Sequence, residues 1–166
     1  MKFTNSLIKG KLQKRYKRFF VDIKVKNSVI TAHCPNTGSM LGLLDKGNDV
    51  WLTKNDDPKR KLKFTLEIIK VKNNLVGVNT LRANKIVKHA LENKLISEFK
   101  NINNIKPEFK YSTDTRFDFL CDKNLIEVKN VTLNREKDTA EFPDAITSRG
   151  SKHLLNLKES MKKGYK

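Results

Sequence analysis

The amino-acid sequence predicts a small β-barrel followed by an α/β region. In the first half, short segments rich in β-branched and aromatic residues are separated by turn residues roughly every ten positions, a spacing typical of small barrels. From residue 83 onwards the apolar residues recur at helical spacing instead. A chain of 166 residues has room for one ordinary domain or two small ones. We therefore predict two domains, residues 1–81 and residues 82–166.

Alternating apolar residues define the strands of the predicted barrel. Val21, Ile23 and Val25 alternate with charged residues at the end of the segment 15–25, which places their side chains on one face of a strand. Further segments that are rich in β-branched residues and bounded by turn residues lie at 28–34, 49–53, 63–71 and 74–78. The Asn-Asn pair between the last two indicates a hairpin turn, so we expect about five strands.

The second half is predicted to run helix, three strands, helix. Between residues 83 and 96 the apolar side chains form one helical stripe, and Asn84 is placed to cap the start of that helix. Strands are expected at 108–111, 116–121 and 125–133, and a second helix at 148–162 with Leu154, Leu157 and Met161 on one face. Such a helix normally leads into a parallel strand. None follows, so we expect a fragment whose α/β domain lacks its last strand.

The charge of the chain predicts a polyanionic partner. The 35 Lys and Arg residues outnumber the 18 Asp and Glu residues, which gives a net charge of +17. Each phosphate that such a surface neutralises releases condensed counterions. Residues 1–80 hold 17 basic and 6 acidic residues, so most of the excess lies in the first half. A second interpretation stays open, because a chain with 28 Lys and 17 Asn also fits a genome-wide compositional bias.

Two basic runs, 9–18 and 58–63, supply the candidate nucleic-acid contacts. The side chains taken from them are Lys14, Arg15, Lys17, Arg18, Lys59, Arg60 and Lys61. The candidate stacking partners for bases are Tyr16, Phe19, Phe20 and Trp51. On a small barrel these runs would form a track for phosphates beside exposed rings. The alternative is an ordinary solvated surface.

Several functional classes are disfavoured by the sequence. No apolar stretch approaches the roughly 18 residues that a membrane-crossing helix needs, and no apolar leader follows the first residues. Cys34 and Cys121 lack metal-ligand spacing, and two distant thiols fit a reducing compartment better than a disulfide framework. His33, His89 and His153 are not spaced as zinc ligands either. We expect a cytoplasmic protein without a membrane partner, and its oligomeric state stays open.

Asp118, Glu127 and Lys129 form the candidate catalytic group. Asp118 lies between two phenylalanines in one expected strand, and Glu127 and Lys129 share a face of the next. If the two strands pair as a hairpin, both carboxylates lie on one surface, where Mg²⁺ or Mn²⁺ bound by Asp118 and Glu127 would relieve their repulsion. Lys129 would then stabilise charge during phosphodiester hydrolysis. The alternative is a solvated ion-pair face of little energetic value.

Seven segments in one order resemble the sugar fermentation stimulation protein A (SfsA) family. They are Arg15–Phe19, His33–Met40, Asp57–Lys61, Val76–Thr80, Arg116–Leu120, Glu127–Leu133, and Phe142–Thr147 with Arg149, Gly150 and Lys152–Leu154. The resemblance spans nearly the whole chain. It implies an N-terminal OB-fold-like five-stranded barrel followed by a PD-(D/E)XK nuclease-like α/β domain.

The resemblance also implies a function. It indicates a DNA-binding protein that regulates sugar metabolism, and it carries a nuclease-like motif onto Asp118, Glu127 and Lys129. A Mg²⁺- or Mn²⁺-dependent deoxyribonuclease is therefore the alternative activity. His89 stands where an acidic residue is expected in the family, so Glu92 or Glu98 would have to supply any third carboxylate. A nuclease fold without activity, which binds a protein or a small effector, is the third alternative.

Overall fold

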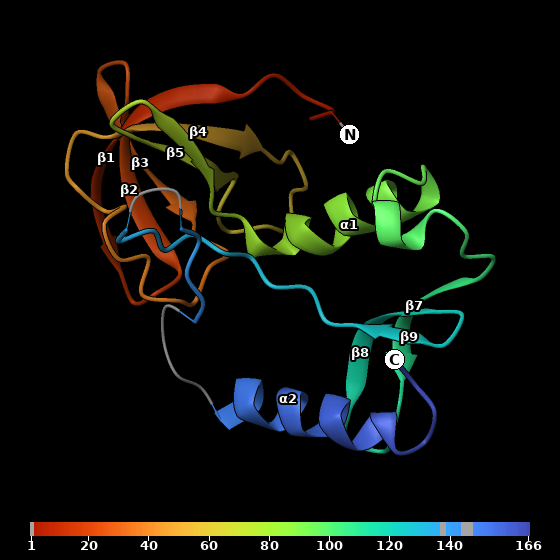
Figure 1. Cartoon of the computed structure of the whole chain (residues 1–166). Helices are drawn as coiled ribbons and strands as arrows, with labels where there is room; N and C mark the ends of the chain where they lie inside the picture. The colour runs from red at the N-terminus through yellow and green to blue at the C-terminus, as the bar shows by residue number, and fades with distance from the viewer. Residues whose placement is uncertain (1, 137–138, 144–147) are drawn as a thin grey trace. The chain divides into compact units, whose positions relative to one another are not determined.

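The computed structural model describes residues 2–136, 139–143 and 148–166 (Figure 1). The chain divides into two compact units. The first comprises Met1–Leu81 and Asn130–Ala145, and the second comprises Arg82–Lys129 and Ile146–Lys166. The last resembling segment of the sequence falls partly outside the described residues, at 144–147.

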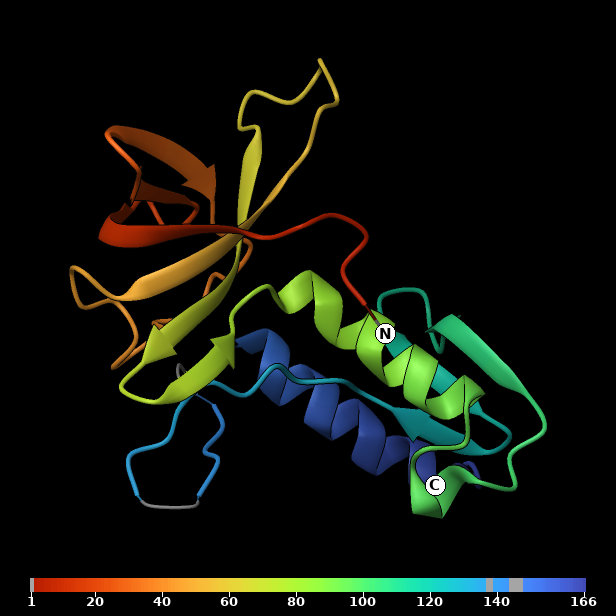
Figure 2. The same ribbon diagram turned by 90° about the horizontal axis from the view of Figure 1, so that it is seen from above.

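The first unit is built on a closed β-barrel. Its strands are β1 (Ile8–Tyr16), β2 (Phe20–Val25), β3 (Ser28–His33), β4 (Asp49–Lys54), β5 (Phe64–Val71) and β6 (Asn74–Gly77). They form one sheet in the order β3-β2-β1-β4-β5-β6 (Figure 2). A parallel contact between His33 of β3 and Thr65 of β5 closes the first five strands into the barrel. The predicted five-stranded barrel is thereby confirmed, with β6 as an additional hairpin strand.

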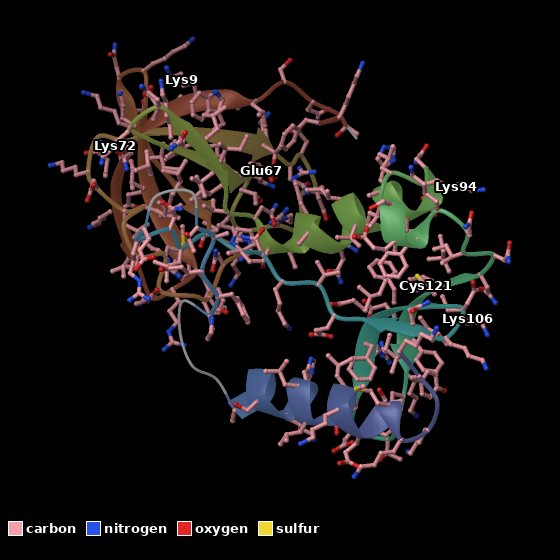
Figure 3. The ribbon with its side chains drawn as sticks, viewed as in Figure 1. Lys9, Glu67, Lys72, Lys94, Lys106 and Cys121 are labelled. Carbon is pink, nitrogen blue, oxygen red and sulfur yellow. The ribbon has the colours of Figure 1, made fainter. Side chains whose placement is uncertain are left out.

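The interior of the barrel is apolar, and strand β5 also carries a buried carboxylate. Its fully buried side chains include Leu12, Val21, Ile23, Val50, Leu52, Leu66 and Ile69. Glu67 is only 2% exposed and accepts hydrogen bonds from Thr53 Oγ1 at 2.7 Å and Asn79 Nδ2 at 2.9 Å (Figure 3). A buried charge requires such partners, because burial without them is costly. Glu67 therefore ties β5 to β4 and to the segment that leaves β6.

Strand β1 is the element that the sequence did not reveal. Its sequence is rich in lysine, and only Gly10 and Leu12 of the strand are buried. The alternation of apolar residues is interrupted at Gly10, which has no side chain. A larger residue does not fit there, because a Cβ atom would lie 2.5 Å from Ile23 Cγ2 and 2.9 Å from the carbonyl oxygen of Lys24. The pairing of β1 with β2 also shifts between Leu12 and Lys14, which interrupts the two-residue period. The strand expected over 15–25 is therefore the end of β1, a turn, and β2.

The second unit contains a three-stranded antiparallel sheet and two α-helices. They are α1 (Ala83–Glu92), β7 (Ile105–Lys110), β8 (Arg116–Cys121), β9 (Asn124–Ile126) and α2 (Ser148–Met161), with short 3₁₀ turns at Thr80–Arg82 and Ser97–Phe99. Leu91 of α1 packs in one cluster with Phe119 and Cys121 of β8. Leu157 of α2 packs in the other, with Phe117. The predicted order of helix, three strands and helix is confirmed.

Three details of the second unit differ from the sequence-based expectation. The first helix ends at Glu92, and Asn84 does not cap it, because the side-chain amide donates to Asp118 instead. Strand β9 ends at Ile126 rather than at residue 133. The face that α2 turns inward includes the small or polar residues His153, Asn156 and Ser160, whereas Leu154 and Met161 are 68% and 67% exposed. Only Leu157 of the expected apolar face packs against the sheet.

The α-helices of the described segments, α1 and α2, have 10 and 14 residues. Not one of them combines the length and the apolar character needed to cross a membrane.

Candidate functional site

The carboxylate of Asp118 lies where β8 meets the segment after β9. Phe119 pairs with Ile126, so Asp118 lies next to Glu127 along the hairpin. Asp118 Oδ1 accepts a hydrogen bond from Asn84 Nδ2 at 2.6 Å, and Oδ2 accepts one from the backbone N–H of Val128 at 2.7 Å. The Val128 contact replaces a ladder hydrogen bond, which explains why β9 stops before Glu127. Asp118 therefore fixes the course of the segment that carries the other two candidate residues.

Glu127 links the candidate catalytic group to α2. Its Oε1 accepts from Lys129 Nζ at 2.5 Å and lies 2.6 Å from Nδ1 of His153. The carboxylate side chain is 10% exposed, and its Oε2 is buried without a hydrogen-bond partner among the described residues. Such an orphaned carboxylate oxygen is unusual in a protein interior. It provides an open ligand position for a cation.

His153 is a residue of this site that sequence reasoning missed. Its side chain is 11% exposed, and its ring meets Phe117 edge to face at 6.3 Å between centroids. A carboxylate can only accept hydrogen bonds, so the contact with Glu127 requires the imidazole to donate from Nδ1. The sequence offers no His or Cys neighbour at ligand spacing that would single out His153. The available signal is its position four residues before Leu157, which packs against the sheet.

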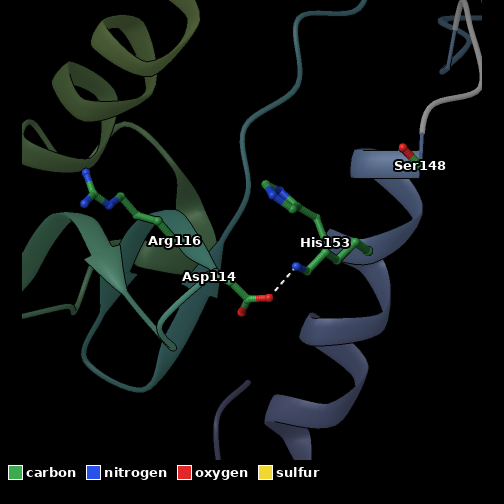
Figure 4. A pocket seen from close by; sticks show the side chains of 5 residues that line it. Asp114, Arg116, Ser148 and His153 are labelled. Carbon is green, nitrogen blue, oxygen red and sulfur yellow. Dashed lines mark hydrogen bonds and ion pairs between the residues drawn. The ribbon is translucent and has the colours of Figure 1, made fainter.

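A pocket of about 410 Å³ opens beside His153 (Figure 4). It is lined by Asp114, Arg116, Ser148, Lys152 and His153. Lys152 Nζ lies 2.5 Å from Asp114 Oδ2. Hydrogen bonds from Lys152 and then Ser112 lower the pKa of Asp114 from 3.8 to about 2. The pocket therefore presents two cationic groups and one carboxylate that is ionised at neutral pH, next to the Glu127 cluster.

The donor set fits a hard divalent cation. Glu127 Oε2 has no hydrogen-bond partner among the described residues. Each oxygen of Asp118 accepts one hydrogen bond, so lone pairs remain on both carboxylates. Oxygen ligands of this kind suit Mg²⁺ or Mn²⁺. The residues proposed for a third carboxylate are engaged elsewhere, Glu92 with Lys88 and Glu98 with Ser97. Across the ranges that the structure describes, no three His, Cys, Asp or Glu residues form a metal cage.

The first basic run lies along the end of β1 and the turn that follows it. Lys14 Nζ lies 3.6 Å from Asp22 and 5.4 Å from the ring centroid of Tyr16. Lys17 and Arg18 form the exposed turn, both with positive φ. Arg15 has a structural role, because its guanidinium donates to the carbonyl oxygens of Asn36, Gly38 and Arg18 at 2.7 to 3.0 Å. It holds the 36–38 loop against the end of β1.

The second basic run approaches the first around His33. Lys59, Arg60 and Lys61 belong to the loop between β4 and β5, and Arg60 Nη2 donates to Thr65 Oγ1 at 3.4 Å. Thr65 is the partner of His33 in the contact that closes the barrel. Partial burial, and then the charge of Arg60, lower the pKa of His33. The exposed Phe19 stacks on His33 at 6.5 Å between ring centroids.

These features define a two-unit protein in which a five-stranded barrel precedes an α/β unit with a carboxylate and lysine cluster. Two family models match the chain. The model described as the SfsA N-terminal OB domain covers residues 14–78, and that described as the sugar fermentation stimulation protein RE domain covers residues 81–166. The chain therefore belongs to the SfsA family.

Individual relatives agree with this assignment. A sugar fermentation stimulation protein homolog from Pelagibacter ubique is 65% identical over 170 residues, spanning 100% of this chain and 73% of the relative. A homolog from Maricaulis maris is 43% identical, spanning 99% of this chain and 72% of its own. The solved structure of Pyrococcus furiosus SfsA in complex with Ca²⁺ superimposes with a TM-score of 0.87 at 23% identity, over 100% of this chain and 71% of the other. This last likeness establishes the fold.

Proposed function

We propose that the protein binds DNA through a basic surface on its barrel, formed by the turn 17–19 and the loop 55–63. The observation that carries the proposal is the geometry around His33. Phe19, next to the turn, stacks on His33, and Arg60 of the loop donates to Thr65, the strand partner of His33. In OB folds the corresponding loops, between the first two strands and between the last two, bind oligonucleotides. We propose that the DNA-bound protein acts as a regulator of genes in the cytoplasm.

The chemistry of this surface suits a nucleic-acid backbone. Lys17, Arg18, Lys59 and Lys61 are exposed, and their ammonium and guanidinium groups can neutralise phosphates. Phe19 is 45% exposed and offers a ring on which a base can stack. Arg15 contributes indirectly by holding the neighbouring loop.

The test is the salt dependence of DNA binding. A double variant, Lys17→Gln with Arg18→Gln, should weaken the salt dependence. The negative slope of log K against log salt should become shallower by about 1.8 for a duplex and about 1.4 for a single strand. Lys94→Gln with Lys106→Gln removes the same charge from the second unit and serves as the control. Weak binding by the wild-type protein, unchanged between about 50 and 200 mM salt, would contradict the proposal.

A second candidate function is metal-dependent phosphodiester hydrolysis at the Glu127 cluster. The specific observation that favours it is the buried, unpartnered Oε2 of Glu127. The Ca²⁺ described with the Pyrococcus furiosus protein supports a cation in this family, although its position is a property of that protein. In this proposal Asp118 and Glu127 hold Mg²⁺ or Mn²⁺, which supplies Lewis-acid stabilisation of phosphoryl oxygens.

The surrounding residues have separate roles in this second candidate. Lys129 lies 2.5 Å from Glu127 Oε1, close enough to place an ammonium beside the charge that develops on a phosphate. His153 orients the Glu127 carboxylate by donating to the same oxygen. Asn84 and the Val128 N–H orient Asp118.

The test of hydrolysis separates cleavage from binding. Labelled single- and double-stranded DNA is incubated with Mg²⁺, Mn²⁺ or EDTA, and cleavage should require the metal and disappear in Glu127→Gln and Lys129→Ala. Both variants should keep the affinity for DNA in EDTA. Wild-type protein that binds DNA without cutting it would refute hydrolysis and leave the regulatory function. Parallel loss of binding and cleavage would point to a folding defect, which thermal unfolding would reveal.

A further inference from the structure

A second hollow lies near the start of β1, away from the turn 17–19. It has a volume of about 460 Å³ and is lined by Lys9, Gly10, Lys11, Lys24, Lys26 and Asp49. Four ammonium groups and one carboxylate give this lining a net charge of +3. Lys9 and Lys11 belong to the start of the first basic run, whereas Lys24 and Lys26 lie outside both runs. From Gly10 to Tyr16 the strand extends about 20 Å, so the hollow is a separate surface.

The lysines of this hollow are arranged unfavourably unless an anion is present. Lys11 and Lys24 are direct partners in the pairing of β1 with β2, and like charges in that position destabilise a sheet. Asp49 compensates for one side, with Lys9 Nζ at 3.0 Å and Lys11 Nζ at 2.7 Å. Lys24 and Lys26 are exposed and have no acidic partner among the described residues. Two cationic side chains are thus left to face an anion from solvent.

The contacts of Asp49 show that the charge here is concentrated. Hydrogen bonds from Lys11 and Lys9 lower the pKa of Asp49, so its carboxylate stays ionised at neutral pH. Its negative charge is already shared by two ammonium groups. A phosphate that entered the hollow would therefore meet Lys24 and Lys26 first.

Trp51 provides a spectroscopic report on the hollow. It is the single tryptophan of the chain and pairs with Lys9 between β4 and β1. The Lys9 ammonium lies 5.5 Å from the centroid of the indole ring, within the range of a cation–π contact. Figure 3 labels Lys9 among the outward-pointing side chains of the first unit. An anion that draws Lys9 away from the ring would change the intrinsic fluorescence.

We propose that this hollow, defined by Lys9, Lys11, Lys24 and Lys26, is a second contact for the phosphates of a bound nucleic acid. The inference rests on the proposed DNA binding and extends it along β1. A nucleic acid is favoured over a free phosphate because the lysines are open to solvent, and because Lys9 and Lys11 lie on the same strand as Lys14 of the first basic run. A span of about 20 Å corresponds to about 6 base pairs of duplex, so longer DNA would reach both contacts.

The experiment compares variants by fluorescence anisotropy with labelled DNA, and by Trp51 emission with unlabelled DNA. Lys24→Gln with Lys26→Gln should reduce the salt slope by about 1.8 on a duplex longer than about 6 base pairs. The matched control is again Lys94→Gln with Lys106→Gln, which should keep the wild-type slope. Asp49→Asn should have the opposite effect and bind more tightly, because it frees Lys9 and Lys11.

The outcomes distinguish this inference from the proposed function. A wild-type protein that does not bind DNA contradicts both. If the Lys24/Lys26 variant keeps the wild-type salt dependence of DNA binding and the Lys17/Arg18 variant loses part of it, the second contact is refuted. The proposed DNA binding through the turn 17–19 would then stand. Inorganic phosphate at equal ionic strength is the competing probe. A full Trp51 response to phosphate with no response to DNA would overturn the assignment to a nucleic acid.

Discussion

Gly10 is the residue on which the packing of β1 against β2 depends most directly. A Cβ atom at this position would meet Ile23 Cγ2 at 2.5 Å and a backbone oxygen at 2.9 Å, and the backbone atom cannot rotate away. We expect Gly10→Ala to lower the free energy of unfolding by about 1–3 kcal/mol through overpacking. Urea unfolding monitored by Trp51 fluorescence measures this change.

Gly77 is the matched control for that substitution. It also lies in a strand, but nothing would approach an added Cβ within 4 Å. Gly77→Ala should therefore leave stability unchanged or raise it by up to about 1 kcal/mol, because it restricts the unfolded chain. Equal effects of the two substitutions would show that backbone entropy, rather than the contact with Ile23, explains the glycine at position 10.

Asp118 is expected to matter for stability as well as for any metal. Asp118→Ala would leave the Val128 N–H and the Asn84 amide without their acceptor, at a cost of about 1–3 kcal/mol. Chemical denaturation followed by circular dichroism measures this loss. Glu108→Ala is the control, because its contact with Arg116 is 3.6 Å long and exposed, so its effect should stay within about 0.5 kcal/mol. An Asp118→Ala variant as stable as the wild type would refute the structural role.

At the scale of elements, the strands predicted correctly are those in which apolar and polar side chains alternate. The predictions failed where a glycine or a side-chain hydrogen bond interrupts that pattern. The bounds of β8 were predicted because Phe117 and Phe119 alternate within it. Strand β1 was missed because a glycine occupies its buried face and a register shift follows. Strand β9 was predicted too long because a side chain, that of Asp118, takes the next backbone hydrogen bond. The spacing of apolar residues does not reveal a glycine on a buried strand face, nor a side chain that replaces a backbone hydrogen-bond partner.

The candidate site shows the same division. Asp118, Glu127 and Lys129 were grouped from strand parity, and the hairpin register places Asp118 beside Glu127. His153 and Asn84 come from two helices remote in sequence, and their contacts depend on how those helices pack on the sheet. Tertiary placement of this kind is not encoded in local spacing. The inward face of α2 was misjudged for the same reason, because polar contacts rather than apolar burial orient the helix.

One of those polar contacts gives a prediction about pH. Asp114 joins the loop before β8 to Lys152 of α2, and its pKa is lowered from 3.8 to about 2. A depressed folded-state pKa means that this contact stabilises the protein above about pH 4, and that the contribution is lost as the pH falls toward 2. Lys152→Gln should return the pKa of Asp114 toward 3.8 in an NMR titration. Lys158→Gln on the same helix should leave it unchanged, and an equal shift in both variants would exclude the specific contact.

At the scale of the whole molecule, each unit contains one buried thiol. Cys34 lies in the barrel core and Cys121 in the core of the second unit, and both are fully buried and free. Burial raises the pKa of each thiol, with Asp122 raising that of Cys121 further. The native protein should therefore resist alkylation at both positions. Each thiol then reports the unfolding of its own unit.

The two units should lose their structure at different denaturant concentrations. Among the described residues, the barrel core has twelve buried members in one cluster, whereas the second unit divides six between two clusters. Burial of apolar surface is the main favourable term in folding, so the second unit should unfold first. Pulsed alkylation across a urea series, read by mass spectrometry of the two cysteine peptides, should label Cys121 before Cys34. Labelling of both at the same urea concentration would instead show that the chain unfolds as one cooperative body, and the reverse order would show that cluster size does not set the stability of these units.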